Sequence, residues 1–439
     1  MIAPLKKAST LKEVHALFDP VRYLSTPAEL EYFYVDRKSG IREEMKILLD
    51  ESLEDKRPVH IFFTGHRGSG KSTEINKLRL ELDNQFFVVP VSFRNRPDVD
   101  YVDLLLKAAN TLFKTATDVE VIRRAPKQIA SEFWEMLVHF VENKVYGDYQ
   151  LAFSEIEKTQ WNSKEVTIKL NALAFEFEAK FEAEPESRKN FKENGGLLLA
   201  EVIDKINMLA DKISDVYQQP VLFIFEDADK IDLKNAEEIF YKHCNTLATL
   251  RACAIYVIDI GLIYNVEFQT AKASFAESLC LHNIKLLSRD NQTIPQNIKL
   301  LERMIDNRAE SHCFTEVAKG LLISSSGGLI RSLITLIRNA TRRAIVEGSE
   351  KVEKNHVEQA IKRHRGDFIA LLDENHYVTL KQKHGSKALD NNSTTQYLLQ
   401  SLALLEYDNG ERWCDVHPVI FPEVEKRTKP TEVENSEHD

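Results

Sequence analysis

One short run restricts the fold of this chain more than any other part of it. Residues 65–72, GHRGSGKS, fit the pattern G-x-x-x-x-G-K-[ST] in full. A β-favouring run precedes it at residues 59–63 (VHIFF), and the segment after it has helical periodicity, with Ile75, Leu78 and Leu82 on one face. A strand, a tight glycine-rich loop and a helix in this order predict the beginning of an α/β domain.

The residue types of this loop suit a polyphosphate. Several backbone N–H donors converge on one point only where the chain curls tightly, which glycine permits, and the next helix adds its positive N-terminal end. Lys71 would span the β- and γ-phosphate oxygens, and the Ser72 hydroxyl would bind Mg²⁺. We therefore expect a nucleotide site with ATP and Mg²⁺ as cofactors; the alternative is a glycine-rich surface turn. The expected binding residues are Gly65, His66, Arg67, Gly68, Ser69, Gly70, Lys71, Ser72 and Thr73.

A second set of candidate site residues follows the apolar run at residues 221–225 (VLFIF). Glu226 and Asp227 come directly after it, where a buried strand would open toward the ligand crevice of a parallel sheet. A phosphate loop needs such acids to hold Mg²⁺ and to polarise attacking water. We expect Glu226 on the metal side and Asp227 as the base. The alternative is that one or both cap the turn at Asp229 and Lys230.

The wider pattern predicts an α/β fold with a parallel sheet and helices on both faces. Further apolar strands are expected at residues 86–93 and 252–260, with a weaker fifth at 281–287. Residues 1–44 have the composition of an extended lead-in, and about residues 94–196 form a long insertion, with helices expected near 99–116 and 127–143 and an alternating strand at 175–181. After Pro295 the pattern is helical to about residue 365. Residues 366–439 form a separate zone with a hairpin signal at residues 408–410.

Three motifs, GHRGSGKST, FIFEDADK and SSSGGLIRSL, resemble the AAA+ superfamily, closest to origin-recognition-like and STAND ATPases. The resemblance covers about residues 35–367, the insertion excepted. It implies a P-loop ATPase core over 45–292, a helical lid over 293–365 and a small winged-helix-like domain over 366–439. It also implies a sensor-1 role for Asp259, a γ-phosphate contact for Arg331 from the lid, and an adenine-side position for residues 33–37 within the lead-in.

Two departures from that family bear on activity. Glu226 stands where Asp is usual, so turnover is less firmly implied than binding. The stretch 261–278, where ring-forming members carry an arginine that acts on the neighbouring subunit, contains no arginine; Arg289 or Arg251 would have to replace it. A switch that closes on ATP is therefore favoured over a constitutive hexameric motor.

Charge and cysteine content limit the partners. The net charge is −10 with a pI near 5.8, and acidic side chains outnumber basic ones about two to one beyond residue 366, which disfavours nucleic acid. The five scattered cysteines and the absence of an apolar leader or membrane span predict a reducing cytoplasm. The pairs His243-Cys244 and His312-Cys313 lack further ligands at useful spacing, so no other metal site is expected.

Three functions remain open from the sequence. The first is an ATP-dependent switch that signals to a protein partner or self-associates, since chains of this build resemble ATPase subunits of bacterial signalling or antiviral defence modules. The second is a DNA-binding, origin-recognition-like loader. The third is a scaffold that binds nucleotide without hydrolysing it.

Overall fold

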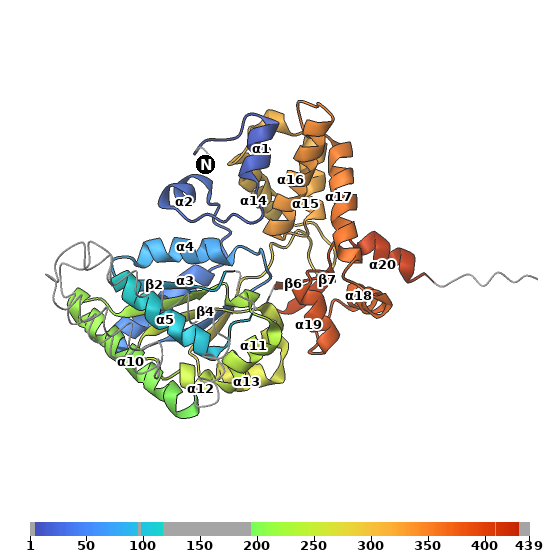
Figure 1. The fold of residues 1–439 in the computed structure, drawn as a ribbon. Helices are drawn as coiled ribbons and strands as arrows, with labels where there is room; N and C mark the ends of the chain where they lie inside the picture. The colour runs from blue at the N-terminus through green and yellow to red at the C-terminus, as the bar shows by residue number, and fades with distance from the viewer. Residues whose placement is uncertain (1–4, 95–97, 117–194, 409, 430–439) are drawn as a thin grey trace, which may run out of the picture.

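The computed structural model describes residues 5–94, 98–116, 195–408 and 410–429 (Figure 1). Its centre is a sheet of five parallel strands in the order β2-β3-β4-β1-β5. The predicted α/β class with a parallel sheet is confirmed. The strands are β1 (His60–Thr64), β2 (Phe87–Ser92), β3 (Val221–Glu226), β4 (Cys253–Val257) and β5 (Glu277–Cys280).

The order of the strands decides which of the loops that follow them lie side by side at the carboxyl edge of the sheet. β1 lies between β4 and β5, and Ile61 is in register with Ile255 on one side and Glu277 on the other. β3, the strand that ends in the acidic residues, pairs with β2 and β4 rather than with β1. The loop after β4 therefore lies between the glycine-rich loop and the acidic turn.

Helices cover both faces of the sheet. Ile61 and Phe63 of β1 are fully buried in one hydrophobic cluster with the helices α3 (Ile41–Asp55) and α4 (Lys71–Leu82). Phe62 points the other way, into the larger cluster that includes residues of α5 and α10. Each fully buried phenylalanine contributes about 2–3 kcal/mol, so both layers are firmly attached. The second layer contains α5 (Tyr101–Ala116), α10 (Gly195–Tyr217), α11 (Leu233–Glu237), η2 (Glu238–Lys242), α12 (Cys244–Leu247), η3 (Ile260–Tyr264) and α13 (Val266–Lys272), and η1 (Ala228–Lys230) follows β3.

The helical zone predicted after Pro295 is present as a separate bundle above the sheet (Figure 1). Gly328, with φ +76°, precedes its long helix α16 and Gly348, with φ +69°, follows it, as the pattern indicated. α1 packs against α16, so the beginning of the chain belongs to this lid. The bundle consists of α14 (Pro295–Asp306), η4 (Ser311–Cys313), α15 (Glu316–Ser325), α16 (Ile330–Val346) and α17 (Lys354–Ile369).

The extended lead-in that we expected is wrong over two stretches, because residues 5–40 contain the helices α1 (Leu11–Leu17) and α2 (Pro27–Phe33). Each begins with a capping box. The side chains of Thr10 and Thr26 accept hydrogen bonds from the backbone N–H groups of Glu13 and Glu29, whose carboxylates bond back to the cap. This T-x-x-E spacing is readable in the sequence and predicts a helix start.

The expected fifth strand over residues 281–287 is also wrong in position. β5 ends at Cys280, and its residues Glu277–Cys280 pair with residues 61–64 of β1. β5 lies at the edge of the sheet, and Glu277 and Ser278 are only partly buried. A search for continuous apolar runs misses such a strand because half of it faces solvent.

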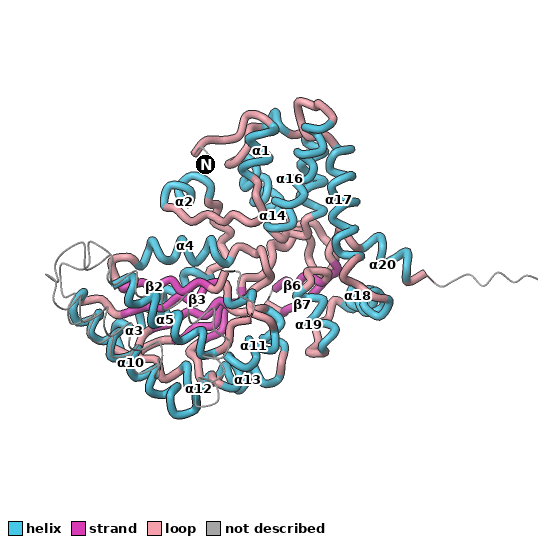
Figure 2. The backbone as a smooth tube through the Cα atoms, in the orientation of Figure 1, coloured by secondary structure: helices cyan, strands magenta, loops and turns pink. Residues whose placement is uncertain are grey.

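The C-terminal elements form a small unit beside the lid and the core (Figure 2). Two helices, α18 (Glu374–Ser386) and α19 (Ser393–Gln400), precede a hairpin of β6 (Leu404–Asp408) and β7 (Arg412–Val416), and α20 (Phe421–Arg427) follows. The strands are antiparallel, with Glu406 opposite Cys414. The predicted hairpin is thus present, and its turn falls where the Asp-Asn-Gly signal lies.

The helix expected near residues 99–116 is α5, whereas the helix expected at 127–143 and the alternating stretch at 175–181 lie outside the described residues. Within the described residues, no helix is both long enough and apolar enough to span a membrane.

Candidate functional site

The glycine-rich loop joins β1 to α4 and has the tight curl that the motif requires. Gly65, Gly68 and Gly70 all have positive φ, at +143°, +88° and +109°. A Cβ atom on Gly65 would lie 2.5 Å from the carbonyl oxygen of Leu281, so no other residue fits there. α4 begins at Lys71 and directs its free N–H groups toward the loop. The loop is therefore a backbone cradle of the kind that holds anions.

Lys71 is 5% exposed and is held inside the loop. Its Nζ donates to the carbonyl oxygens of Gly65 (2.7 Å) and His66 (3.1 Å) and lies 2.8 Å from Oδ2 of Asp229. A buried ammonium needs such partners, since its desolvation is costly. A phosphate that enters this loop would replace these oxygens with its own.

The acidic turn after β3 presents three carboxylates in three environments. Glu226 is buried, its Oε1 lies 3.5 Å from Nη1 of Arg79, and burial raises its pKa. Asp227 has φ +64° and accepts a hydrogen bond from the Ser92 hydroxyl (2.9 Å) while it pairs with Lys230. Only the third carboxylate, Asp229, contacts Lys71.

Asp229 lines the cavity and pairs with Lys71, and our sequence analysis gave it no role in the site. We considered it only as part of a turn, and we assigned both acidic roles to Glu226 and Asp227. The available signal was its place in Glu-Asp-x-Asp-Lys: a 3₁₀ turn over Ala228–Lys230 moves the carboxylate two residues beyond the pair back toward the loop. Its main-chain carbonyl also accepts two hydrogen bonds from the guanidinium of Arg67 (2.8 and 3.1 Å).

Asp259 follows β4 and is 3% exposed, beside the loop. Its Oδ1 accepts hydrogen bonds from the backbone N–H of Gly261 (2.7 Å) and the side-chain amide of Gln400 (3.2 Å), and its Oδ2 lies 3.7 Å from Nε of Arg67. Burial raises the pKa of this carboxyl. Asp259 thus contacts a loop residue on one side and the C-terminal unit on the other.

Arg331 brings the lid onto the loop. Its backbone N–H donates to the carbonyl of Gly68 (3.1 Å), and its Nε donates to the carbonyl of Pro20 (3.4 Å). A Cβ atom on Gly68 would lie only 2.2 Å from Cβ of Arg331. The first turn of α16 therefore rests directly on the loop, which a side chain at position 68 would prevent.

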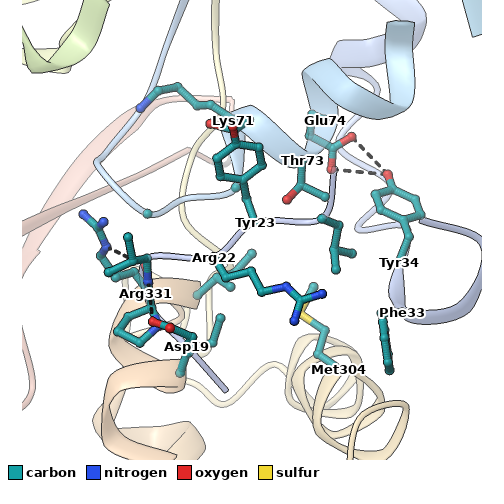
Figure 3. A pocket seen from close by; sticks show the side chains of 18 of the residues that line it. Asp19, Arg22, Tyr23, Phe33, Tyr34, Lys71, Thr73, Glu74, Met304 and Arg331 are labelled. Carbon is teal, nitrogen blue, oxygen red and sulfur yellow. Dashed lines mark hydrogen bonds between the residues drawn. The ribbon is translucent and has the colours of Figure 1, made fainter. Parts of the chain in front are cut away.

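These segments enclose a cavity of about 790 Å³, within the range of nucleotide and cofactor pockets (Figure 3). Figure 3 shows Lys71 and Thr73 on the α4 side and Arg331 and Asp19 on the lid side. At the other end, aromatic and apolar side chains of the lead-in and the lid line the wall. Figure 3 shows Phe33, Tyr34 and Met304 there, whereas Tyr23 lies beside Lys71; Val35 and Ile334 also line the cavity.

The predicted site residues divide into two groups around this cavity. Those that line it are Arg67, Gly68, Gly70, Lys71, Ser72, Thr73, Asp227 and Arg331, together with Asp229. Those that do not line it are Gly65, His66, Ser69, Glu226 and Asp259. The roles of both groups stay predictions, because a residue's place beside a cavity does not assign its chemistry.

His66 joins the loop to the C-terminal unit. Its ring is fully buried, and its Nε2 accepts a hydrogen bond from the backbone N–H of Glu406 (2.8 Å). Burial lowers the pKa of His66 to about 4, so the ring is neutral at pH 7. A residue of the glycine-rich loop thus contacts β6 directly.

No protein-family model and no curated protein sequence matches this chain. Solved structures that match include Cdc6p from Pyrobaculum aerophilum, at 11% identity over 94% of this chain and 98% of that one, with a TM-score of 0.44. The Walker-type ATPase of Pyrococcus abyssi matches at 14% identity over 93% and 99%, with a TM-score of 0.45. The RuvB Holliday junction branch migration motor of Thermotoga maritima matches at 11% over 93% and 99%, with a TM-score of 0.38. These likenesses have identities of 11–14% and TM-scores of 0.38–0.45, so the AAA+ resemblance continues to rest on the motifs themselves.

Proposed function

We propose that this protein binds ATP with Mg²⁺ in the 790 Å³ cavity and hydrolyses it, and that the lid changes position with the nucleotide. The observation that carries the proposal is the meeting of three parts of the chain at one point. A left-handed glycine loop, a buried lysine paired with a carboxylate, and a lid arginine all line the same cavity. This combination of backbone donors and positive charge suits a triphosphate.

The proposed roles follow from these contacts. Lys71 transfers its bonds from Asp229 and the loop carbonyls to the phosphate oxygens. Ser72 and the carboxylates of Asp227 and Asp229 line the cavity, and oxygen donors of this kind fit Mg²⁺. Bound Mg²⁺ would neutralise charge on the phosphate oxygens. Asp227 remains our proposed base, and Glu226, which faces Arg79 outside the cavity, has less support for the metal-side role than Asp229.

The base side of the cavity favours a planar ring. Phe33, Tyr34 and Met304 present apolar surface there, and the guanidinium of the partly buried Arg308 lies 5.6 Å from the Phe33 ring centre. We assign the adenine to this end, between the lead-in and α14. The assignment agrees with the adenine-side position that the resemblance implies for residues 33–37.

The lid is the proposed moving part. Arg331 is bonded to the loop through its main chain, while its guanidinium carries a positive charge beside the cavity. A γ-phosphate would attract that charge, and its loss on hydrolysis would remove the attraction. The angle between the lid and the core would then report the nucleotide state.

The direct test is nucleotide binding and phosphate release by matched lysine variants. Lys71→Ala should abolish ATP binding in a calorimetric titration, whereas Lys46→Ala, on the exposed side of α3, should bind as the wild type does. Asp227→Asn should keep ATP binding within a few-fold and lose phosphate release. Binding by Lys71→Ala at wild-type affinity would refute the proposed site. Wild-type binding without phosphate release would support the scaffold alternative.

The proposed partner is another protein, in a signalling or defence module, but one observation favours nucleic acid as a second candidate. Arg342, Arg343 and Arg363 are exposed on neighbouring lid helices, and in the described part of the chain no carboxylate lies within ion-pair distance of them. Slight desolvation and the charges of the neighbouring arginines lower the pKa of Arg342. Duplex affinity across a salt series separates the candidates: a steep loss with salt that Arg342→Ala reduces supports DNA, and a flat, weak response leaves the protein partner.

A further inference from the structure

A second group of ligand-type side chains lies away from the nucleotide cavity. Cys280 at the end of β5, His282 two residues later and Glu406 on β6 bring a sulfur, a ring nitrogen and a carboxylate oxygen within 4.8 Å of one another. Cys280 is 6% exposed and Glu406 is fully buried. The three residues come from the core and from the C-terminal unit, so the cluster spans the boundary between them.

The distances in this cluster suit donors that share one ion. Sγ of Cys280 lies 3.6 Å from Nδ1 of His282, and the same nitrogen lies 3.2 Å from Oε1 of Glu406. Two donors bound tetrahedrally to Zn²⁺ at about 2.0–2.3 Å are separated by roughly 3.3–3.6 Å. Two of the three donor pairs therefore match the spacing of zinc ligands, and the third pair, Sγ of Cys280 and the Glu406 carboxylate, lies within 4.8 Å.

The carboxylate of Glu406 lacks well-formed hydrogen bonds. Neither carboxylate oxygen of Glu406 has a partner with good hydrogen-bond geometry among the described residues, although the His282 ring and the Tyr264 hydroxyl lie beside it. A buried carboxylate that has ion pairs but no well-formed hydrogen bond is costly, and a bound cation lowers that cost. Two charges reach the carboxylate: the ring of His282 and the guanidinium of Arg412, whose Nε lies 3.8 Å from Oε1.

A fourth residue stands where a supporting carboxylate is expected. Oδ2 of Asp408 lies 3.2 Å from Nε2 of His282, on the far side of the ring from Glu406. Histidines that bind metal through one nitrogen commonly donate the other N–H to a carboxylate, which fixes the ring orientation. Asp408 would leave the Nδ1 lone pair free to face Cys280 and Glu406.

We propose that Cys280, His282 and Glu406 bind a Zn²⁺ ion in an open, three-ligand arrangement that joins the β6–β7 hairpin to the end of β5. A thiolate, a neutral imidazole and a carboxylate balance the charge of the ion and are donors that zinc prefers. Water takes the fourth position, near the Tyr264 hydroxyl. Arg412, whose side chain is 40% exposed, turns toward solvent when the ion is bound. The site is distinct from the Mg²⁺ site and does not depend on nucleotide binding.

Cobalt is the probe of choice, because a thiolate bound to Co²⁺ gives a charge-transfer absorption that an all-oxygen magnesium site cannot give. The full chain, treated with chelator and kept free of nucleotide, should bind one Co²⁺ with this absorption and lose it when Zn²⁺ is added. Cys280→Ser should lack the absorption, and Cys313→Ser, a buried lid cysteine, should retain it. Asp408→Asn should weaken Zn²⁺ binding by about 10–100-fold.

Two outcomes would overturn the proposal. One is folded wild-type protein, checked by circular dichroism, that binds no Co²⁺ with thiolate absorption. The other is Cys280→Ser protein that keeps the absorption of the wild type. The wild-type titration decides the matter even if a variant does not fold.

Discussion

Replacement of Gly68 by alanine tests the contact between the lid and the phosphate loop. Gly68 has φ +88°, and its added Cβ would lie 2.2 Å from Cβ of Arg331. Gly348, at the end of α16, has a similar φ of +69°, but nothing lies within 4 Å of its added Cβ. The two alanine variants therefore share the backbone strain and differ in the steric clash.

The magnitudes follow from this difference. Alanine in the left-handed region costs about 1–2 kcal/mol at either position. Carbon atoms in contact prefer about 3.5–4.0 Å, so Gly68→Ala must also move the first turn of α16 by roughly 1.5 Å. That movement stretches the bond from the Arg331 N–H to the Gly68 carbonyl, which is 3.1 Å long. We expect a further loss of on the order of 1–2 kcal/mol, since the bond and the packing around it are weakened.

Thermal unfolding and amide exchange measure the two parts separately. Gly348→Ala should lower the unfolding midpoint by about 1–2 °C, and Gly68→Ala should lower it by about twice as much. The Arg331 amide should exchange faster in Gly68→Ala and remain protected in Gly348→Ala. Equal midpoints for the two variants, with Arg331 equally protected, would refute the inference that the lid rests on the loop.

Three more perturbations follow from the site. Because burial holds the pKa of His66 near 4 while the unfolded chain titrates near 6.5, stability should fall as the pH drops below 6.5, by about 2 kcal/mol at pH 5; His66→Gln should flatten this slope in thermal scans. Asp229→Asn should bind ATP several-fold more tightly in EDTA, because Lys71 then has no ion pair to break before it contacts the phosphates. Unchanged affinity would count against the pairing of Lys71 with Asp229. Thr26→Ala should cost about 1 kcal/mol through the lost α2 cap, and an unchanged midpoint would contradict that role.

The sequence predicted those features that depend on neighbouring residues. The run at residues 59–72 specifies a strand, a turn and a helix through periodicity and glycine spacing, and these are β1, the loop and α4. Gly328 and Gly348 likewise mark the ends of a lid helix through their conformational freedom. The caps of α1 and α2 are equally local, and we would have predicted these helices from the Thr-x-x-Glu spacing.

What the sequence could not predict are contacts between distant segments. Asp229 pairs with Lys71 across 158 positions of sequence, and only the strand order together with the 3₁₀ turn brings them together. The contact between His66 and the backbone of Glu406 spans 340 positions. No period or spacing encodes such pairs, because they depend on how separately folded parts dock.

The contacts among the glycine-rich loop, the lid and the C-terminal unit determine which parts would move together. The glycine loop is held from the lid side by Arg331 and from the C-terminal side by the bond between His66 and Glu406. The C-terminal unit in turn contacts the lid, where the Tyr407 hydroxyl donates to the carbonyl of Gly327 (2.6 Å). These three contacts form a closed circuit, so the lid cannot rotate away from the loop without straining the hairpin or releasing it. A movement of Arg331 would therefore strain the lid contact and the hairpin contact together.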